Sequence, residues 1–292
     1  MKKILMLTTG GDIAGEHTDT GLVPVYTGEQ LVSMVPELRE YCELECKDIM
    51  QLDGTNVQPE DWITIAEEVY DAQEAYDGVI ITHGTDTMAY SACAVSLMVQ
   101  NLQKPVIFTG AQIAMVDPDT DGKKNLLDAV HAAVSGIPGV YVVFGGRIIR
   151  GIRAQKMYTR ALDAFHSINA GDAGYVQDGE VFLNQSVPTP VGEPVLDTRL
   201  EPKVVQLKLL PGIEPKQLES MLGMGYYGII LEAFGCGGIP NQNRNLLPCL
   251  KRAKQFGVAV LVATQCKYGN VDLGVYDVNV QAAREGAMSV YD

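Results

Sequence analysis

The chain has 292 residues, of which 47% are hydrophobic and 20% charged. This composition is typical of globular proteins and excludes an intrinsically disordered chain. The length is sufficient for two domains of ordinary size. The formal net charge of -14 predicts repulsion from nucleic acid and from anionic membrane surfaces, so we expect neither as a partner.

The N-terminus predicts a buried strand rather than a targeting segment. The basic start Met1–Lys3 precedes only four apolar residues, Ile4–Leu7, which is too short for a secretory signal or a membrane span. The six cysteines form no CxxC pair, so we expect no zinc site, no other metal and no cofactor. Free thiols are typical of a reducing compartment, and we expect the protein in the cytoplasm.

Short apolar segments alternate with amphipathic segments along the first part of the chain. Strands are predicted at Ile4–Leu7, Cys42–Met50, Gly78–Thr82, Pro105–Thr109 and Gly139–Phe144. Helices are predicted at Thr27–Leu38, Gln58–Tyr76, Thr87–Asn101 and Lys123–Val134. Such alternation is typical of a mainly parallel sheet that is covered by helices on both faces.

A proline-rich segment, residues 186–203, interrupts this alternation, and we interpret it as an interdomain linker. Strands are predicted again at Val204–Leu209, Gly228–Glu232 and Val258–Thr264, and helices at Glu214–Met224 and Asn245–Phe256. We therefore predict an α/β fold with a larger N-terminal domain (1–185), the linker (186–203) and a smaller C-terminal α/β domain (204–292).

Three polar loops that contain glycine follow predicted strands: Thr8–Gly15, Leu52–Asn56 and Thr82–Met88. Ligands of open parallel sheets bind beyond the carboxyl ends of the strands, so we expect a site for a small polar ligand there. Helix capping is an alternative explanation for Thr85, Asp86 and Thr87. A nucleotide cradle would suit the glycines equally, but the chain has no G-x-G-x-x-G or Walker lysine pattern.

The first of these loops contains Thr9-Gly10-Gly11-x-Ile13-Ala14, and the third contains His83-Gly84-Thr85-Asp86-Thr87-Met88. Together they resemble the two signatures of the bacterial L-asparaginase family, with the greatest similarity to its cytoplasmic, type I branch. The resemblance extends over nearly the whole chain. It includes Gln58-Pro59-Glu60-Asp61-Trp62, Lys124-Asn125-Leu126-Leu127-Asp128-Ala129, Arg153-Ala154-Gln155-Lys156 and Thr264-Gln265-Cys266.

The resemblance implies hydrolysis of L-asparagine to L-aspartate and ammonia, in two steps. In the family, a threonine of the first loop attacks the amide carbon, and water then releases aspartate. The catalytic positions correspond to Asp12, Thr85, Asp86 and Lys156, of which the last three would activate a hydroxyl and carry the proton. Taken alone, Lys156 would be interpreted as a surface cation.

The resemblance also implies the residues that bind substrate and the assembly of the protein. The substrate-binding residues are Gly11, Gly54, Thr55, Gly84, Thr85, Asp86 and Ala111. The partner is a small amino-acid amide, either asparagine or glutamine. A homodimer or homotetramer is expected, with each site completed by the smaller domain of a neighbouring subunit.

The sequence departs from the family pattern at several positions. Asp12 stands where the family has its nucleophilic threonine, and it could be a carboxylate nucleophile, a base that activates water, or the mark of a silent site that binds a small amino acid without turnover. Gly54 stands where the family has a serine for the substrate α-carboxylate. Tyr26 is a candidate for the lid tyrosine, although Leu22 occupies the aligned place. The smaller domain is expected to lack the family's last element.

Overall fold

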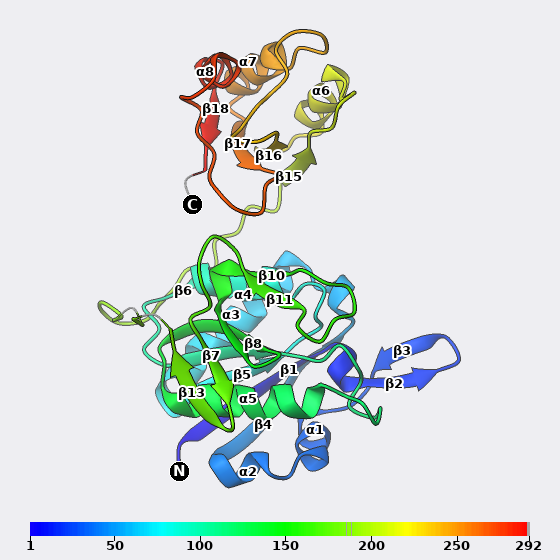
Figure 1. Cartoon of the computed structure of the whole chain (residues 1–292), viewed down its shortest axis with the longest axis vertical. Coiled ribbons are helices and arrows are strands. Elements are labelled where there is room, and N and C mark those ends of the chain that lie inside the picture. The colour runs from blue at the N-terminus through cyan, green and yellow to red at the C-terminus, as the bar shows by residue number, and fades with distance from the viewer. Residues whose placement is uncertain (185, 188, 291–292) are drawn as a thin grey trace. The chain divides into compact units, whose positions relative to one another are not determined.

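The computed structural model describes residues 1–184, 186–187 and 189–290. It divides into two compact units, Met1–Arg199 and Leu200–Asp292 (Figure 1). Each unit has its own sheet and its own hydrophobic core. The predicted α/β fold with a larger and a smaller domain is therefore confirmed, whereas the exact limits of the linker stay a prediction.

The first unit is built on an eight-stranded sheet with the order β13-β12-β9-β8-β7-β5-β1-β4. The parallel strands are β1 (Lys3–Gly10), β4 (Glu43–Leu52), β5 (Gly78–Thr82), β7 (Pro105–Thr109) and β8 (Gly139–Phe144). Three antiparallel strands extend it beside β8: β9 (Arg147–Arg150), β12 (Gly174–Gln177) and β13 (Glu180–Leu183). The central strands β5 and β7 are buried along their whole length, as continuous apolar segments require.

Helices cover both faces of this sheet. Alternate strand residues such as Ile4, Ile80 and Ile107 share a core with one set of helices. This set is α1 (Gly28–Met34), α2 (Leu38–Tyr41) and α5 (Gly122–Ser135). The helices α3 (Pro59–Ala75) and α4 (Met88–Met98) pack on each other and contact the strands from the other face. The prediction of one helix over Thr27–Leu38 is wrong, because Pro36 lacks an N–H and disfavours helical geometry at Val35.

Smaller elements complete the first unit. They are the hairpin β2 (Gly15–Thr18) and β3 (Gly21–Pro24), the pair β10 (Ala154–Lys156) and β11 (Phe165–Ser167), and the pair β6 (Val99–Gln100) and β14 (Val195–Leu196). Short 3₁₀ turns are η1 (Asp12–Ala14), η2 (Gly54–Asn56) and η3 (Gly151–Arg153). Within the described part of the chain, no helix is both long and apolar enough to cross a membrane.

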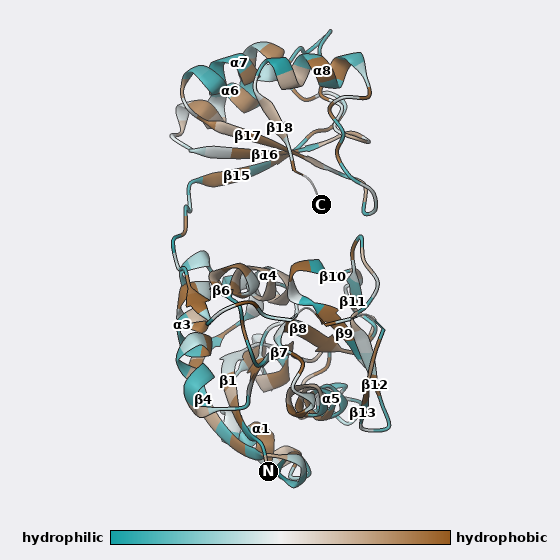
Figure 2. Ribbon diagram, turned by 90° about the vertical axis from the view of Figure 1, so that its left-hand side faces the viewer, coloured by the Kyte–Doolittle hydropathy of each residue, from teal (hydrophilic) through white to brown (hydrophobic). Residues whose placement is uncertain are grey.

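The second unit is a parallel sheet in the order β15-β16-β17-β18. Its strands are β15 (Val204–Lys208), β16 (Gly228–Ala233), β17 (Ala259–Thr264) and β18 (Ala287–Ser289), and its helices are α6 (Pro215–Gly223), α7 (Leu247–Gln255) and α8 (Asp277–Arg284). Figure 2 shows the three helices on one side of this sheet. The sequence analysis missed α8 and β18, which are short and follow a polar segment.

The three glycine-containing loops of the first unit meet where their strands end. Gly11 has a φ of +77°, a left-handed conformation that favours glycine. A Cβ atom at Gly11 would lie 2.4 Å from the backbone nitrogen of Gly84, and one at Gly84 would lie 2.5 Å from the Cα atom of Gly54. The three turns therefore approach each other as closely as they do because none of the three residues has a side chain.

We predict that the first proteolytic cut falls within residues 186–203. This segment carries exposed side chains, such as that of Val191 at 82% exposure, and its described residues contain only the two-residue strand β14. Limited digestion with a protease of broad specificity, followed by mass spectrometry of the fragments, measures the position of the cut. A primary cut within Gly78–Met88 would contradict the domain limits.

We predict that Gly84→Ala destabilises the protein. The added methyl group would overlap the backbone of Gly54, and overpacking of this kind costs about 1–3 kcal/mol. Gly223→Ala is the matched control, because this helical glycine has open space around it and should be neutral or up to about 1 kcal/mol stabilising. Denaturant unfolding of both variants measures the difference, and equal midpoints would show that the turns are not in contact.

Candidate functional site

The candidate site lies at the carboxyl ends of four neighbouring parallel strands, β7, β5, β1 and β4. Asp12 follows β1, Gly54 follows β4, Thr85 and Asp86 follow β5, and Ala111 follows β7. The sheet order thus brings together loops that are up to about 100 residues apart in the sequence. Loops at this edge were predicted to form the site, and the topology places them side by side.

Lys156 reaches the loop after β5 from the separate pair β10 and β11. Its Nζ atom donates to the hydroxyl oxygen of Thr85 at 2.8 Å and to a carboxylate oxygen of Asp86 at 2.7 Å. The Lys156 side chain is 17% exposed and that of Asp86 58%, whereas Thr85 is buried. Lys156 is therefore not a free surface cation. It connects the Thr85 hydroxyl to the Asp86 carboxylate.

Asp12 begins η1, is half-buried, and lies in an acidic environment. Burial raises the pKa of its carboxyl above the ordinary value, and the negative charges of Asp53, Asp86 and Asp121 raise this pKa further. The positive charge of Lys156 acts in the opposite direction. A raised pKa makes the Asp12 carboxylate a stronger base than an exposed aspartate.

The other predicted residues lie at the same edge with different exposures. Gly11, Gly54 and Gly84 form the close contact between turns, and the carbonyl of Gly54 accepts from the Thr87 hydroxyl at 2.5 Å. Thr55 is exposed and donates from its hydroxyl and its backbone N–H to Asp53. Ala111 is fully buried in the core of the first unit, so in this structure it is not exposed to a ligand.

Gln112 is a residue of the site that the sequence analysis missed. Its Oε1 atom accepts from the Thr85 hydroxyl at 3.2 Å, and its Nε2 atom donates to the carbonyls of Thr159 and Ala161. The Asp121 carboxylate holds the backbone N–H of Gln112 at 3.0 Å. Gln112 could have been predicted from its position in the loop that follows β7, because ligands bind beyond the carboxyl ends of parallel strands.

His83 stabilises the loop that follows β5. The sequence analysis did not assign this residue to the site. Its ring is fully buried, and burial lowers its pKa to about 4, so the imidazole is neutral at pH 7. Its Nδ1 atom lies 2.8 Å from the carbonyl of Gly84, which can only accept, so Nδ1 carries the proton. Its Nε2 atom therefore accepts from the Ser91 hydroxyl at 2.8 Å. The ring thereby connects the Gly84 turn to α4.

The arrangement has the components of proton-transfer chemistry on a small polar ligand. It contains a base of raised pKa, a hydroxyl, a lysine that bridges the hydroxyl to a carboxylate, and backbone groups at loop turns. Among residues 1–184, 186–187 and 189–290, no group of three or more His, Cys, Asp or Glu side chains could hold a metal ion.

Comparison with known proteins gives the family of both units. The family model "Asparaginase, N-terminal" matches residues 3–189, and the model "Glutaminase/Asparaginase C-terminal domain" matches residues 203–292. An L-asparaginase of Thermococcus kodakarensis is 39% identical over 99% of this chain and 88% of its own length. A glutamyl-tRNA(Gln) amidotransferase subunit of Pyrococcus abyssi is 35% identical over the whole of this chain and 69% of its own length.

Solved structures agree with these matches. The thermostable L-asparaginase from Thermococcus kodakarensis superimposes with a TM-score of 0.93 over 98% of this chain and 87% of the other, at 39% identity. L-asparaginase I from Vibrio cholerae gives a TM-score of 0.88 over 100% of this chain and 88% of the other, at 32% identity. These relatives come from both archaea and bacteria. The chain therefore belongs to the asparaginase family and is an enzyme of the amidohydrolase type.

Proposed function

We propose that this protein hydrolyses the side-chain amide of a small amino acid, with L-asparagine as the first candidate substrate. The observation that carries the proposal is the pair of hydrogen bonds from Lys156 to Thr85 and Asp86. A lysine that bridges a buried hydroxyl and a carboxylate can pass a proton along the contact. The exposed Asp86 carboxylate is also available to bind the α-amino group of the substrate by a charge-assisted hydrogen bond.

We assign Asp12 the part of a general base that activates water. Its raised pKa suits a base, whereas attack by a carboxylate on the amide would form an anhydride and have to expel ammonia, a poor leaving group. In the proposed step, the water oxygen attacks the amide carbon and its proton passes to Asp12. The amide nitrogen takes a proton from the Lys156 ammonium through the Thr85 hydroxyl and leaves as ammonia, and the substrate side chain becomes a carboxyl group. The proton held by Asp12 then restores the ammonium.

A second candidate function is binding without turnover. Two departures from the family pattern favour it: Asp12 stands in place of the nucleophilic threonine, and Gly54 stands in place of the serine that binds the substrate α-carboxylate. The amidotransferase relatives suggest a third context for the same chemistry, as a subunit of an amidotransferase. The assays below separate hydrolysis from silent binding.

We further propose that the protein belongs to the cytoplasmic, type I branch and assembles as a homodimer or homotetramer. The likeness to L-asparaginase I of Vibrio cholerae supports the branch. A probable cytoplasmic L-asparaginase from Campylobacter jejuni, at 28% identity and a TM-score of 0.83, supports the compartment, as do six free cysteines. Exposed apolar side chains of the smaller unit, such as Tyr227 and Phe256, support association.

We predict that Asp12→Asn lowers kcat for L-asparagine by about 10²–10⁴-fold, because the variant lacks the base. In the parent protein, kcat/KM should rise as the pH rises through the pKa of Asp12, since only the carboxylate accepts a proton. Ammonia release from L-asparagine and L-glutamine measures both effects, and Asp71→Asn, on the exposed face of α3, is the control. A parent without activity beside an active Asp12→Thr variant would identify a silent site instead.

We predict that L-aspartate binds more tightly to Asp12→Asn than to the parent at pH 7. A negative charge about 4 Å from a ligand carboxylate costs up to about 4 kcal/mol at an effective dielectric constant of 20. Because the pKa of Asp12 is raised, its carboxyl gains a proton at a higher pH than an exposed aspartate, and the affinity of the parent should increase as the pH is lowered from 8 to 4.

Calorimetric titration across this pH range tests the effect of the Asp12 charge. The affinity of Asp12→Asn should change less with pH than that of the parent. Equal affinities of the two proteins at pH 7 would show that Asp12 does not face the ligand.

A further inference from the structure

A pocket of the first unit lies at the opposite edge of the sheet from the candidate active site. It has a volume of about 370 Å³. Its wall includes the start of β8, the end of β9 and the residues before β7, and Tyr141 pairs with Arg150 in the antiparallel ladder. The amino-terminal ends of the parallel strands lie at this edge, so the pocket is separate from the loops that carry Asp12 and Thr85.

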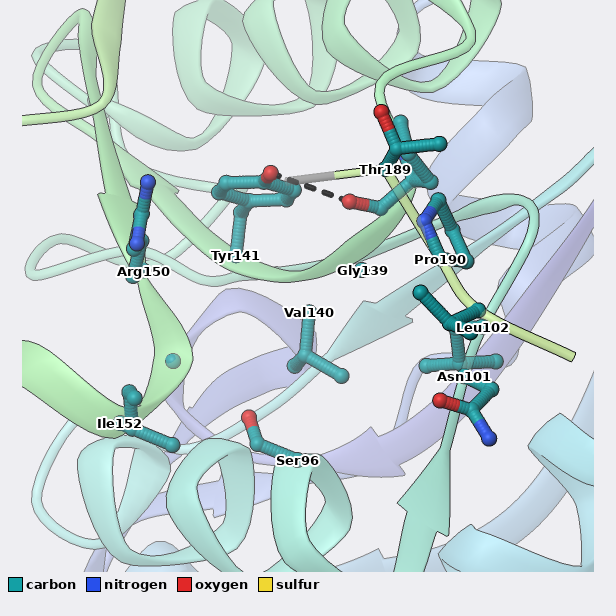
Figure 3. A pocket seen from close by; sticks show the side chains of 13 residues that line it. Ser96, Asn101, Leu102, Gly139, Val140, Tyr141, Arg150, Ile152, Thr189 and Pro190 are labelled. Atoms are coloured by element: carbon teal, nitrogen blue, oxygen red, sulfur yellow. Dashed lines mark hydrogen bonds between the residues drawn. The ribbon is translucent and has the colours of Figure 1, made fainter. Parts of the chain in front are cut away.

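The pocket combines an apolar surface with a single charge (Figure 3). Leu102, Val140, Ile152 and Pro190 supply apolar side chains. Arg150 is the one charged residue among the described residues that line it, and no carboxylate accompanies it there. The volume of this pocket is near the lower end of the usual range for ligand sites, so the pocket suits a ring or a short branched chain rather than a nucleotide.

Arg150 retains unused hydrogen-bonding capacity. Its Nε atom is buried and has no hydrogen-bond partner among the described residues. Its Nη2 atom makes a long bond, 3.4 Å, to the carbonyl of Ser186. A guanidinium has five N–H donors in a planar fork that matches a carboxylate, and a buried donor without a partner is uncommon in a native protein.

We propose that this pocket binds a compact organic monoanion, a carboxylate with an apolar body, through the Arg150 guanidinium. The carboxylate would accept from the Nη N–H groups of the guanidinium, and the apolar body would lie against Val140, Ile152 and Leu102. A dianion is disfavoured, because one cation faces the pocket and the chain carries a net charge of -14.

Benzoate is a suitable probe, and benzamide is its neutral counterpart of nearly the same shape. Titration calorimetry of the full chain at pH 7 should give saturable binding of benzoate with a Kd of about 1 mM or tighter. Benzamide should bind at least about tenfold more weakly, because it lacks the charge that pairs with Arg150. Failure of benzoate to bind, or equal affinities of the two probes, would overturn the proposal.

Single-residue variants identify the site at which benzoate binds. Arg150→Met should weaken benzoate by at least about tenfold, whereas Arg150→Lys, which keeps the charge without the fork, should have an intermediate effect. Arg252→Met, in α7 of the other unit, and Asp12→Asn should both leave benzoate affinity unchanged. Unchanged affinity in Arg150→Met, or tighter binding of benzoate in Asp12→Asn, would assign the probe to another site. Circular dichroism of each variant confirms that it is folded.

Discussion

The candidate site depends on the close contact of three turns at the ends of β1, β4 and β5. Gly11, Gly54 and Gly84 have no side chains, so the backbones of these turns approach within distances that a Cβ atom would prevent. This contact sets the distance between Asp12 on one turn and Thr85 on another. The neutral, buried His83 ring stabilises the same contact, because it bonds to the carbonyl of Gly84 and to α4.

Periodicity and chain order were sufficient to predict most of the elements that form this framework. β5, β7 and β8 have the predicted limits, because each is a short apolar segment between polar turns. The edge at which the site lies also followed from sequence, since ligands of parallel sheets bind at the strand ends. The contact of Lys156 with Thr85 could be inferred only by resemblance, because it joins residues 71 positions apart through a three-residue strand that has no periodic signal. Gln112 was missed for a related reason: its role depends on hydrogen bonds to carbonyls of a distant loop.

The candidate active site and the Arg150 pocket share structural elements although they lie at opposite edges of the sheet. α4 begins directly after Thr85–Thr87, and Ser96 near its other end lines the Arg150 pocket. η3 lines that pocket through Gly151 and Ile152 and continues into β10, which ends at Lys156. A Cβ atom at Gly151 would lie 2.6 Å from the Ser96 hydroxyl, so α4 and η3 are in close contact there. A shift of η3 against α4 would therefore change the position of Lys156 relative to Thr85.

The distribution of charge around Asp12 has different consequences for a substrate and for its product. Asp53, Asp86 and Asp121 add negative charge near Asp12, and Lys156 is the cation that opposes them. An amino-acid amide has no net charge, and its ammonium group is attracted by Asp86 as its carboxylate is repelled. In the proposed reaction, hydrolysis would add a second carboxylate to the same molecule, close to Asp12. We therefore expect the product to bind less favourably than the substrate, because the added charge would lie near the partly buried Asp12 carboxylate. An acidic site of this kind weakens the retention of its product, and it does so through the same carboxylate that we propose as the base.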